Sequence, residues 1–130
     1  MLDHVCLVVH DLTRSAAFYE SALAPLGHTN VIAYPGHEGH AALRGFGDEQ
    51  EAYLLLKTGT PHPETVHLAF AAPTKRAVTA FYEAALAAGG QDNGPPGPRP
   101  KYFAGYYAAY VLDPDGYNVE AVFQQRRRSL

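Results

Sequence analysis

The chain has 130 residues, of which 47% are hydrophobic and 18% charged, and its formal net charge is −3. This length and composition are typical of one globular domain with a hydrophobic core, and the acidic balance argues against a nucleic-acid-binding surface. No apolar run approaches the roughly 20 residues of a membrane span, and the start, MLDHVCLVVHD, lacks the basic region and cleavage site of a signal peptide. We therefore expect a cytoplasmic protein without a membrane partner. The single cysteine, Cys6, excludes an intrachain disulfide framework.

An internal repeat is the main organisational feature of the chain. An offset of 63 residues superposes His4 on His67 and Phe18-Tyr19-Glu20 on Phe81-Tyr82-Glu83. Self-similarity at a fixed offset indicates a tandem duplication of a small module. The sequence therefore predicts one domain, residues 1–130, with module one at 1–60, module two at 64–124 and a basic tail at 125–130.

Each module is predicted to begin with an alternating apolar strand and to continue with an amphipathic helix. The helix follows a capping residue, which is Asp11 or Thr13 in module one and Thr74 in module two, and ends at glycine. Module one then continues with three short strands near residues 29–34, 41–46 and 51–57, separated by glycine-rich turns. The order of elements is βαβββ, which places the chain in the α+β class.

Residues 89–105, GGQDNGPPGPRPKYFAG, follow the helix of module two. They are too rich in glycine and proline for a continuous regular element, so we expect a loop over one end of the sheet. Two interpretations of this loop stay open, a lid and a plain surface connection.

Two strand-like runs in residues 102–123 flank the tetrapeptide Asp113-Pro114-Asp115-Gly116, which predicts a β-hairpin. Glu120 lies in the middle of the return strand, on the face opposite Tyr117 and Val119. An unpaired buried carboxylate is costly, so Glu120 needs a cation, a salt bridge or a metal as its partner.

The repeat also defines the candidate chemistry. His4 and His67 occupy equivalent positions, so approximate two-fold symmetry puts them on matching faces, and close together if the two strands flank the module interface. With Glu120 they form a set of two histidines and one carboxylate that leaves metal positions open for water and substrate.

These features resemble the vicinal oxygen chelate superfamily, which includes glyoxalase I, extradiol dioxygenases, fosfomycin-resistance transferases and bleomycin-binding proteins. The resemblance covers nearly the whole chain, and its most specific part is the ending DPDGYNVEAVF. It implies two tandem βαβββ modules that form a cup-shaped, eight-stranded mixed sheet with helices on the outside. It also implies a homodimer and one divalent metal, Fe, Mn, Ni or Zn, with His4, His67 and Glu120 as ligands.

The chain departs from the four-ligand glyoxalase I pattern. Those enzymes have a second acidic residue on the last strand of module one, and the corresponding stretch here, AYLLLK, has Leu55 at that position. Glu51 would substitute for it only after a shift of register. The departure disfavours four-ligand glyoxalase I chemistry.

Further candidate residues come from the hairpin and the preceding loop. A tight turn pairs Ala109 with Glu120, whereas one extra residue at the glycine pairs Tyr110 with it. We choose the second register because fosfomycin-type relatives have a tyrosine at the position of Tyr110. Candidate catalytic residues are then Tyr110 and Glu120; candidate substrate contacts are Tyr107, Arg99 and Lys101. His37 and His40 are interpreted as turn residues.

Two functions remain. The first is a metalloenzyme that chelates a small substrate through adjacent oxygens, with dioxygenase, lyase or isomerase, and transferase chemistry all open. The second is a metal-free binding or resistance protein that sequesters a small aromatic compound in the cup.

Overall fold

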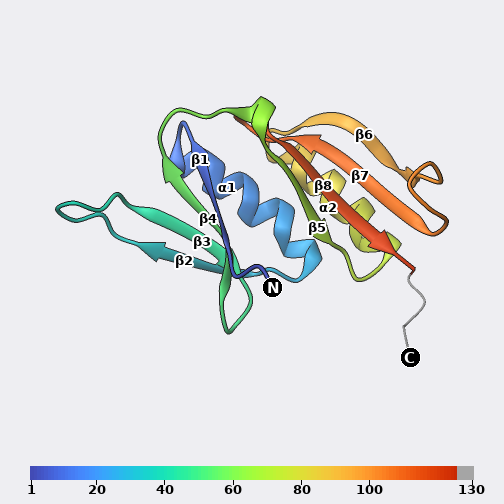
Figure 1. Ribbon diagram of the computed structural model, residues 1–130, viewed down its shortest axis with the longest axis horizontal. Coiled ribbons are helices and arrows are strands. Elements are labelled where there is room, and N and C mark those ends of the chain that lie inside the picture. The colour runs from blue at the N-terminus through green and yellow to red at the C-terminus, as the bar shows by residue number, and fades with distance from the viewer. Residues whose placement is uncertain (126–130) are drawn as a thin grey trace.

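The computed structural model describes residues 1–125 and shows the element order βαβββ twice (Figure 1). The basic tail predicted at 125–130, with Arg126, Arg127 and Arg128, lies outside the described residues except for its first position. Module one consists of β1 (Val5–Val9), α1 (Leu12–Leu23), η1 (Ala24–Leu26), β2 (Asn30–Tyr34), β3 (Leu43–Gly47) and β4 (Ala52–Thr58). A short turn, η2 (Pro63–Thr65), leads to β5 (His67–Ala71), α2 (Lys75–Ala87), β6 (Gln91–Pro98), β7 (Tyr106–Leu112) and β8 (Asn118–Gln124).

The eight strands form two four-stranded mixed sheets with equivalent topology. Their orders are β1-β4-β3-β2 and β5-β8-β7-β6, and the first pair in each sheet is parallel while the others are antiparallel. The α+β class with two tandem βαβββ modules is confirmed. Within residues 1–125 no ladder joins the two sheets, so each module keeps its own sheet.

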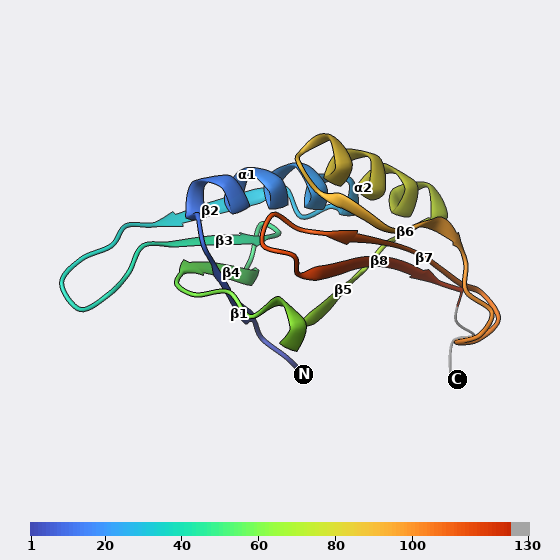
Figure 2. The same cartoon turned by 90° about the horizontal axis from the view of Figure 1, so that it is seen from above.

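Both helices lie on the same side of the two sheets and pack against each other (Figure 2). Side chains cap both N-termini: Asp11 accepts the backbone N–H of Arg14 at 3.1 Å, and Thr74 accepts that of Ala77 at 3.0 Å. None of the helices in the described residues is long and apolar enough to cross a membrane.

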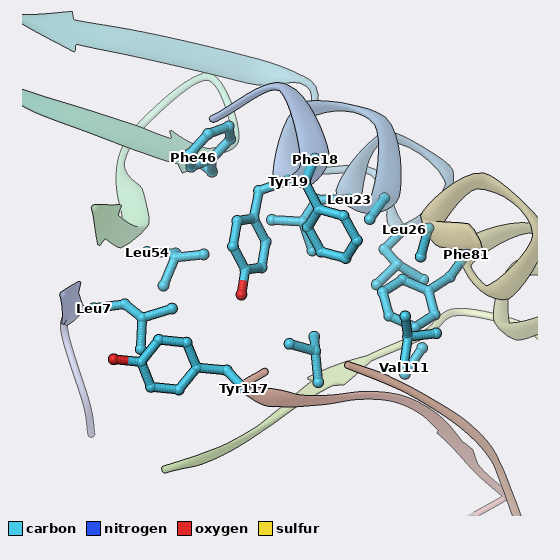
Figure 3. Packing of buried hydrophobic residues seen from close by; sticks show 14 of the residues in the cluster. Leu7, Phe18, Tyr19, Leu23, Leu26, Phe46, Leu54, Phe81, Val111 and Tyr117 are labelled. Carbon is cyan, nitrogen blue, oxygen red and sulfur yellow. The ribbon is translucent and has the colours of Figure 1, made fainter. Parts of the chain in front are cut away.

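The core lies between the helices and the helix-facing sides of the sheets (Figure 3). The repeated Phe-Tyr motif contributes to it in both copies, because Phe18, Tyr19 and Phe81 are fully buried. The motif is therefore part of the packing between helix and sheet.

Part of the stretch expected to be a loop is a strand. β6 (Gln91–Pro98) pairs with β7, with register shifts between Asp92 and Gly94 and between Gly94 and Gly97. Proline lacks a backbone N–H and is tolerated on edge strands and at bulges, and β6 is both an edge strand and irregular. The expectation of a loop over 89–105 is therefore wrong for 91–98.

The hairpin between β7 and β8 has the bulged register. Tyr110 pairs with Glu120 and Ala109 with Ala121, as the choice of one extra residue predicted. The N–H of Asp113 donates to the carbonyl of Tyr117 at 2.9 Å, and Gly116 has a φ of 90°, a left-handed conformation that favours glycine.

The same turn joins the two modules. The Tyr19 hydroxyl donates to Asp113 at 2.5 Å, and Arg14 forms an ion pair with Asp115 at 3.3 Å. The Tyr117 hydroxyl donates to the carbonyl of Val8 at 2.6 Å. The DPDG turn therefore holds module two against β1 and α1 in addition to reversing the chain.

Candidate functional site

The helix-free face of the module-two sheet brings together His67, Glu120 and Tyr110. β5 and β8 pair Ala69 with Glu120, so His67 lies diagonally across from the carboxylate, while Tyr110 pairs with it from β7. His67 Nε2 is 2.9 Å from Glu120 Oε1. Glu120 is 3% exposed, whereas the His67 side chain is 46% exposed. The pair thus combines a buried carboxylate with an accessible imidazole.

Two partners that the sequence did not single out hold this pair in place. The Tyr106 hydroxyl donates to Glu120 Oε2, and the Asn118 amide donates to His67 Nδ1 at 2.7 Å. Asn93 in turn donates to Asn118 Oδ1 at 3.3 Å. By period two, Tyr106 shares the face of Tyr110 and Asn118 shares the face of Glu120. The contact of Asn118 with His67 depends in addition on the pairing of β5 with β8, which sets these two residues opposite each other.

Tyr110 lies beside the histidine. Its ring centre is 6.2 Å from that of His67. The Arg99 guanidinium lies 5.4 Å from the same Tyr110 ring centre. Burial, followed by the nearby Glu120 carboxylate, raises the pKa of Tyr110 to about 12. The same two causes raise the pKa of Tyr106. Both phenols therefore resist ionisation more strongly than an ordinary tyrosine, and that of Tyr106 donates to Glu120.

An aromatic rim borders the site at residues 101–106. The ring centre of Tyr106 is 5.0 Å from that of Tyr102 and 5.3 Å from that of Phe103, and the Lys101 ammonium is 5.2 Å from the Tyr102 ring centre. Tyr102 and Phe103 are 53% and 46% exposed. Exposed aromatic rings beside a lysine are suited to planar or anionic ligands.

Tyr107 occupies the opposite face of β7. Its ring packs against the hydrophobic core, and the Lys75 ammonium lies 5.5 Å from its centre. The structure therefore does not bring Tyr107 to His67 and Glu120.

His4 is also separate from the pair. Its Nδ1 lies 2.6 Å from Asp3 Oδ1, and the side chain is half exposed just before β1. Within residues 1–125, no three histidine, cysteine, aspartate or glutamate side chains converge as a metal site. In the described residues no hydrogen bond or ion pair joins His4 to His67 or Glu120, although the two histidines are equivalent in the repeat.

An apolar cavity of about 440 Å³ extends from His67 between the modules. Its lining comes from the N-terminal segment, the start of β4 and β5: Leu2, Val5, Tyr53, Leu54, His67, Leu68, Ala69 and Phe70. A cavity of this size, mainly apolar with the polar side chains of His67 and Tyr53 in its lining, suits a small organic ligand.

The sequence profile of the Glyoxalase/Bleomycin resistance protein/Dioxygenase superfamily matches residues 1–121. The chain belongs to this superfamily. A glyoxalase/bleomycin resistance protein from Albidiferax ferrireducens T118 has a similar structure, with 29% identity, a TM-score of 0.75 and coverage of 94% of this chain and 97% of that one. No curated protein matches the chain in sequence.

Two other solved structures show the range of the superfamily. Glyoxalase I from Zea mays is 28% identical, with a TM-score of 0.70, and the match covers 92% of this chain and 44% of the maize chain. A glyoxalase-related enzyme from Fulvimarina pelagi is 24% identical, with a TM-score of 0.71 and coverage of 95% and 88%. The second likeness shows the fold alone.

The two modules differ at the strand positions equivalent to Glu120 and Tyr110. Cys6 and Ala69 are equivalent in the repeat; Cys6 pairs with Leu55 where Ala69 pairs with Glu120. Gly45 pairs with Leu55 where Tyr110 pairs with Glu120. Module one therefore has apolar residues at both positions that module two fills with polar groups.

The donor types in module two, an imidazole and a carboxylate, are ones that bind divalent metal ions. His67 Nε2 and Glu120 Oε1 lie 2.9 Å apart, and each ligand has an outer partner, Asn118 or Tyr106. Outer partners of this kind orient metal ligands. Imidazole and carboxylate together suit zinc, iron, nickel and manganese.

Proposed function

We propose that this protein is a metal-dependent enzyme of the vicinal oxygen chelate type, with His67, Glu120 and His4 as ligands of one divalent ion. The observation that carries the proposal is the 2.9 Å approach of His67 Nε2 to Glu120 Oε1 on adjacent strands, at the end of an apolar cavity. Rigid strands and outer hydrogen bonds preorganise the two donor atoms.

The alternative that Glu120 is a structural carboxylate is less favourable. In the part of the chain described, no lysine or arginine forms an ion pair with Glu120, although it is almost fully buried. A buried carboxylate whose partners are one exposed imidazole and one phenol retains a need for positive charge. A metal ion supplies it.

The third ligand is proposed to come from a second copy of the chain. His4 is exposed, and its Nδ1 contacts Asp3, which leaves Nε2 available as a donor. Because His4 and the pair His67–Glu120 are separate within one chain, a homodimer that joins module one of one copy to module two of the other completes the set. Two histidines and one carboxylate leave positions for two substrate oxygens.

The remaining groups have roles set by their chemistry. The metal, when bound, polarises the substrate oxygens as a Lewis acid. Tyr110, whose ring centre lies 6.2 Å from that of His67, donates a hydrogen bond to the substrate at this site. Arg99 and Lys101 attract an anionic substrate group, and the rim of Tyr102 and Phe103 contacts its planar part.

Metal analysis tests the proposal. Wild type and the variants His67→Ala, Glu120→Ala and His4→Ala are stripped, reloaded and assayed for bound metal, with His62→Ala as the control because the His62 side chain is exposed and its Nδ1 faces Glu64 rather than the pair. After dialysis that removes weakly bound surface metal, we expect one tightly bound equivalent in wild type and the control, and loss of that equivalent in the other three. Unchanged occupancy in both His67→Ala and Glu120→Ala would overturn the assignment.

Mixing tests the shared site. If each site combines two chains, His4→Ala mixed with Glu120→Ala yields heterodimers with one intact site, so metal binding returns on mixing. Reconstituted forms are then screened against catechols, 2-oxoaldehyde–thiol adducts and epoxides to assign the reaction.

The exposed aromatic rim favours one second candidate, a metal-free protein that binds a small aromatic compound. In that case His67→Ala and Glu120→Ala leave aromatic ligand binding intact, whereas Tyr102→Ala and Phe103→Ala abolish it.

A further inference from the structure

The hairpin between β2 and β3 projects from the body of the protein (Figure 1). Two histidines close its tip: the N–H of His37 donates to the carbonyl of His40 at 2.9 Å, and the N–H of His40 donates to that of His37 at 2.8 Å. In such an antiparallel pair both side chains leave the same face of the ribbon. The two imidazoles are therefore directed to one side by the backbone.

The separation of the rings matches that of two imidazoles on one metal ion. With a metal–nitrogen bond of about 2.0 Å, an imidazole centre lies about 3.2 Å from the ion, so two rings about 90° apart have centres roughly 4.5 Å apart. The His37 and His40 centres are 4.7 Å apart, with an interplanar angle of 51°. His37 Nδ1 contacts the carbonyl of Glu38 at 3.3 Å, which leaves Nε2 for coordination.

We propose that His37 and His40 form a surface site for a divalent transition-metal ion, with Cu²⁺ bound more tightly than Ni²⁺ or Zn²⁺. Neutral imidazole suits these ions, and copper has the highest intrinsic affinity among them. Both residues are exposed, so the ion enters freely and water completes its coordination. The site is independent of the proposed centre at His67 and Glu120.

The turn keeps the two ligands preorganised. Gly39 has a φ of 81°, a left-handed conformation that favours glycine, and the two backbone hydrogen bonds fix the distance between the strands at the tip. Binding therefore orders few additional degrees of freedom.

The experiment uses the full chain with the double substitution His67→Ala, Glu120→Gln, which removes the other proposed centre. Cu²⁺ is added and followed by calorimetry and electron paramagnetic resonance. We expect one saturable equivalent, with hyperfine coupling to two nitrogens and broadening of the amide resonances of residues 36–42. Further substitution of His37 or His40 by alanine removes the saturable binding, whereas His62→Ala retains it.

Binding that persists in both His37→Ala and His40→Ala, or coupling to a single nitrogen, would refute the site. Because the background lacks His67 and Glu120, failure here says nothing against the proposed function. Conversely, loss of metal from the proposed centre leaves this site unchanged.

Discussion

Asn118 bonds the side of His67 that faces away from Glu120. The Asn118 amide nitrogen is 2.7 Å from His67 Nδ1, while His67 Nε2 is 2.9 Å from Glu120 Oε1. A side-chain amide presents either its nitrogen or, after a flip, its oxygen to a neighbouring imidazole. Asn118 is therefore able to partner His67 whether Nδ1 carries a proton or not, and it fixes the ring orientation in both cases.

The first prediction concerns this contact. Asn118→Leu keeps the approximate volume but removes the amide, and we expect metal affinity to fall by about 10- to 100-fold, the usual cost of losing an outer-shell partner. Asn118→Asp, which retains an acceptor for Nδ1–H, restores most of the affinity. Competition with a chelating dye measures both. Equal affinity in wild type and Asn118→Leu would show that the amide does not position His67.

Tyr106 and Tyr110 are predicted to differ although they share a face. Tyr106→Phe deprives Glu120 of its hydroxyl donor, so the free energy of unfolding drops by about 1–3 kcal/mol, the range for leaving a buried acceptor unsatisfied. Tyr110→Phe is expected to leave metal content and melting temperature nearly unchanged and to reduce kcat. Chemical denaturation and turnover with an identified substrate separate the two roles. A stability loss confined to Tyr110→Phe would reverse the assignment.

A substitution at Leu55 tests whether the repeat places this residue next to the metal. It occupies the position in module one that Glu120 occupies in module two. Leu55→Glu adds a fourth ligand beside His4, so metal affinity rises and exchangeable water on bound Mn²⁺ decreases, as measured by proton relaxation. Lys57→Glu, two residues further along the same strand, is the matched control. If neither the metal affinity nor the exchangeable water changes, position 55 does not lie next to the metal.

The buried turn carboxylate Asp113 predicts a pH dependence of stability. Burial raises the pKa of Asp113 above its ordinary value of 3.8, against the hydrogen bonds that it accepts. Near and above pH 3.8 the folded state therefore binds more protons at Asp113 than the unfolded state does. The stabilisation from this group is complete below pH 3.8, and it is lost as the pH rises through the higher pKa of the folded state.

Asp113→Asn removes this contribution. We expect the stability of wild type relative to Asp113→Asn to decrease as the pH increases above 3.8, in urea denaturation at a series of pH values. Asp3→Asn, at an exposed carboxylate, serves as the control and follows wild type. Parallel curves for wild type and Asp113→Asn would contradict the direction of the shift.

The proposed shared site requires a homodimer. Sedimentation at micromolar concentration is expected to show a species of twice the chain mass of 14.1 kDa. The unpaired edges of β1 and β5 offer backbone groups for such contacts. A single species at the chain mass would leave His4 outside the metal site.

The sequence by itself determined the elements that depend on local pattern. Strand alternation, helix period and capping residues act within one module, and the repeat shows each of them twice, so the βαβββ order and the DPDG hairpin were predictable. The bulged register that pairs Tyr110 with Glu120 was also predicted, because the turn chemistry leaves two choices and a resemblance selects one.

Tertiary structure decided which of these residues meet. His4 and His67 are equivalent in the repeat, yet their strands belong to two sheets, and within residues 1–125 no cluster of three metal-ligand side chains includes both. β6 is a strand despite its prolines because the edge of β7 is available for pairing. Tyr107 packs against the core because the register that pairs Tyr110 with Glu120 puts Tyr107 on the opposite face of β7. Asn118 and Tyr106 became partners of His67 and Glu120 only across strand pairs. Contacts of that kind depend on long-range pairing and side-chain reach, which local periodicity does not encode.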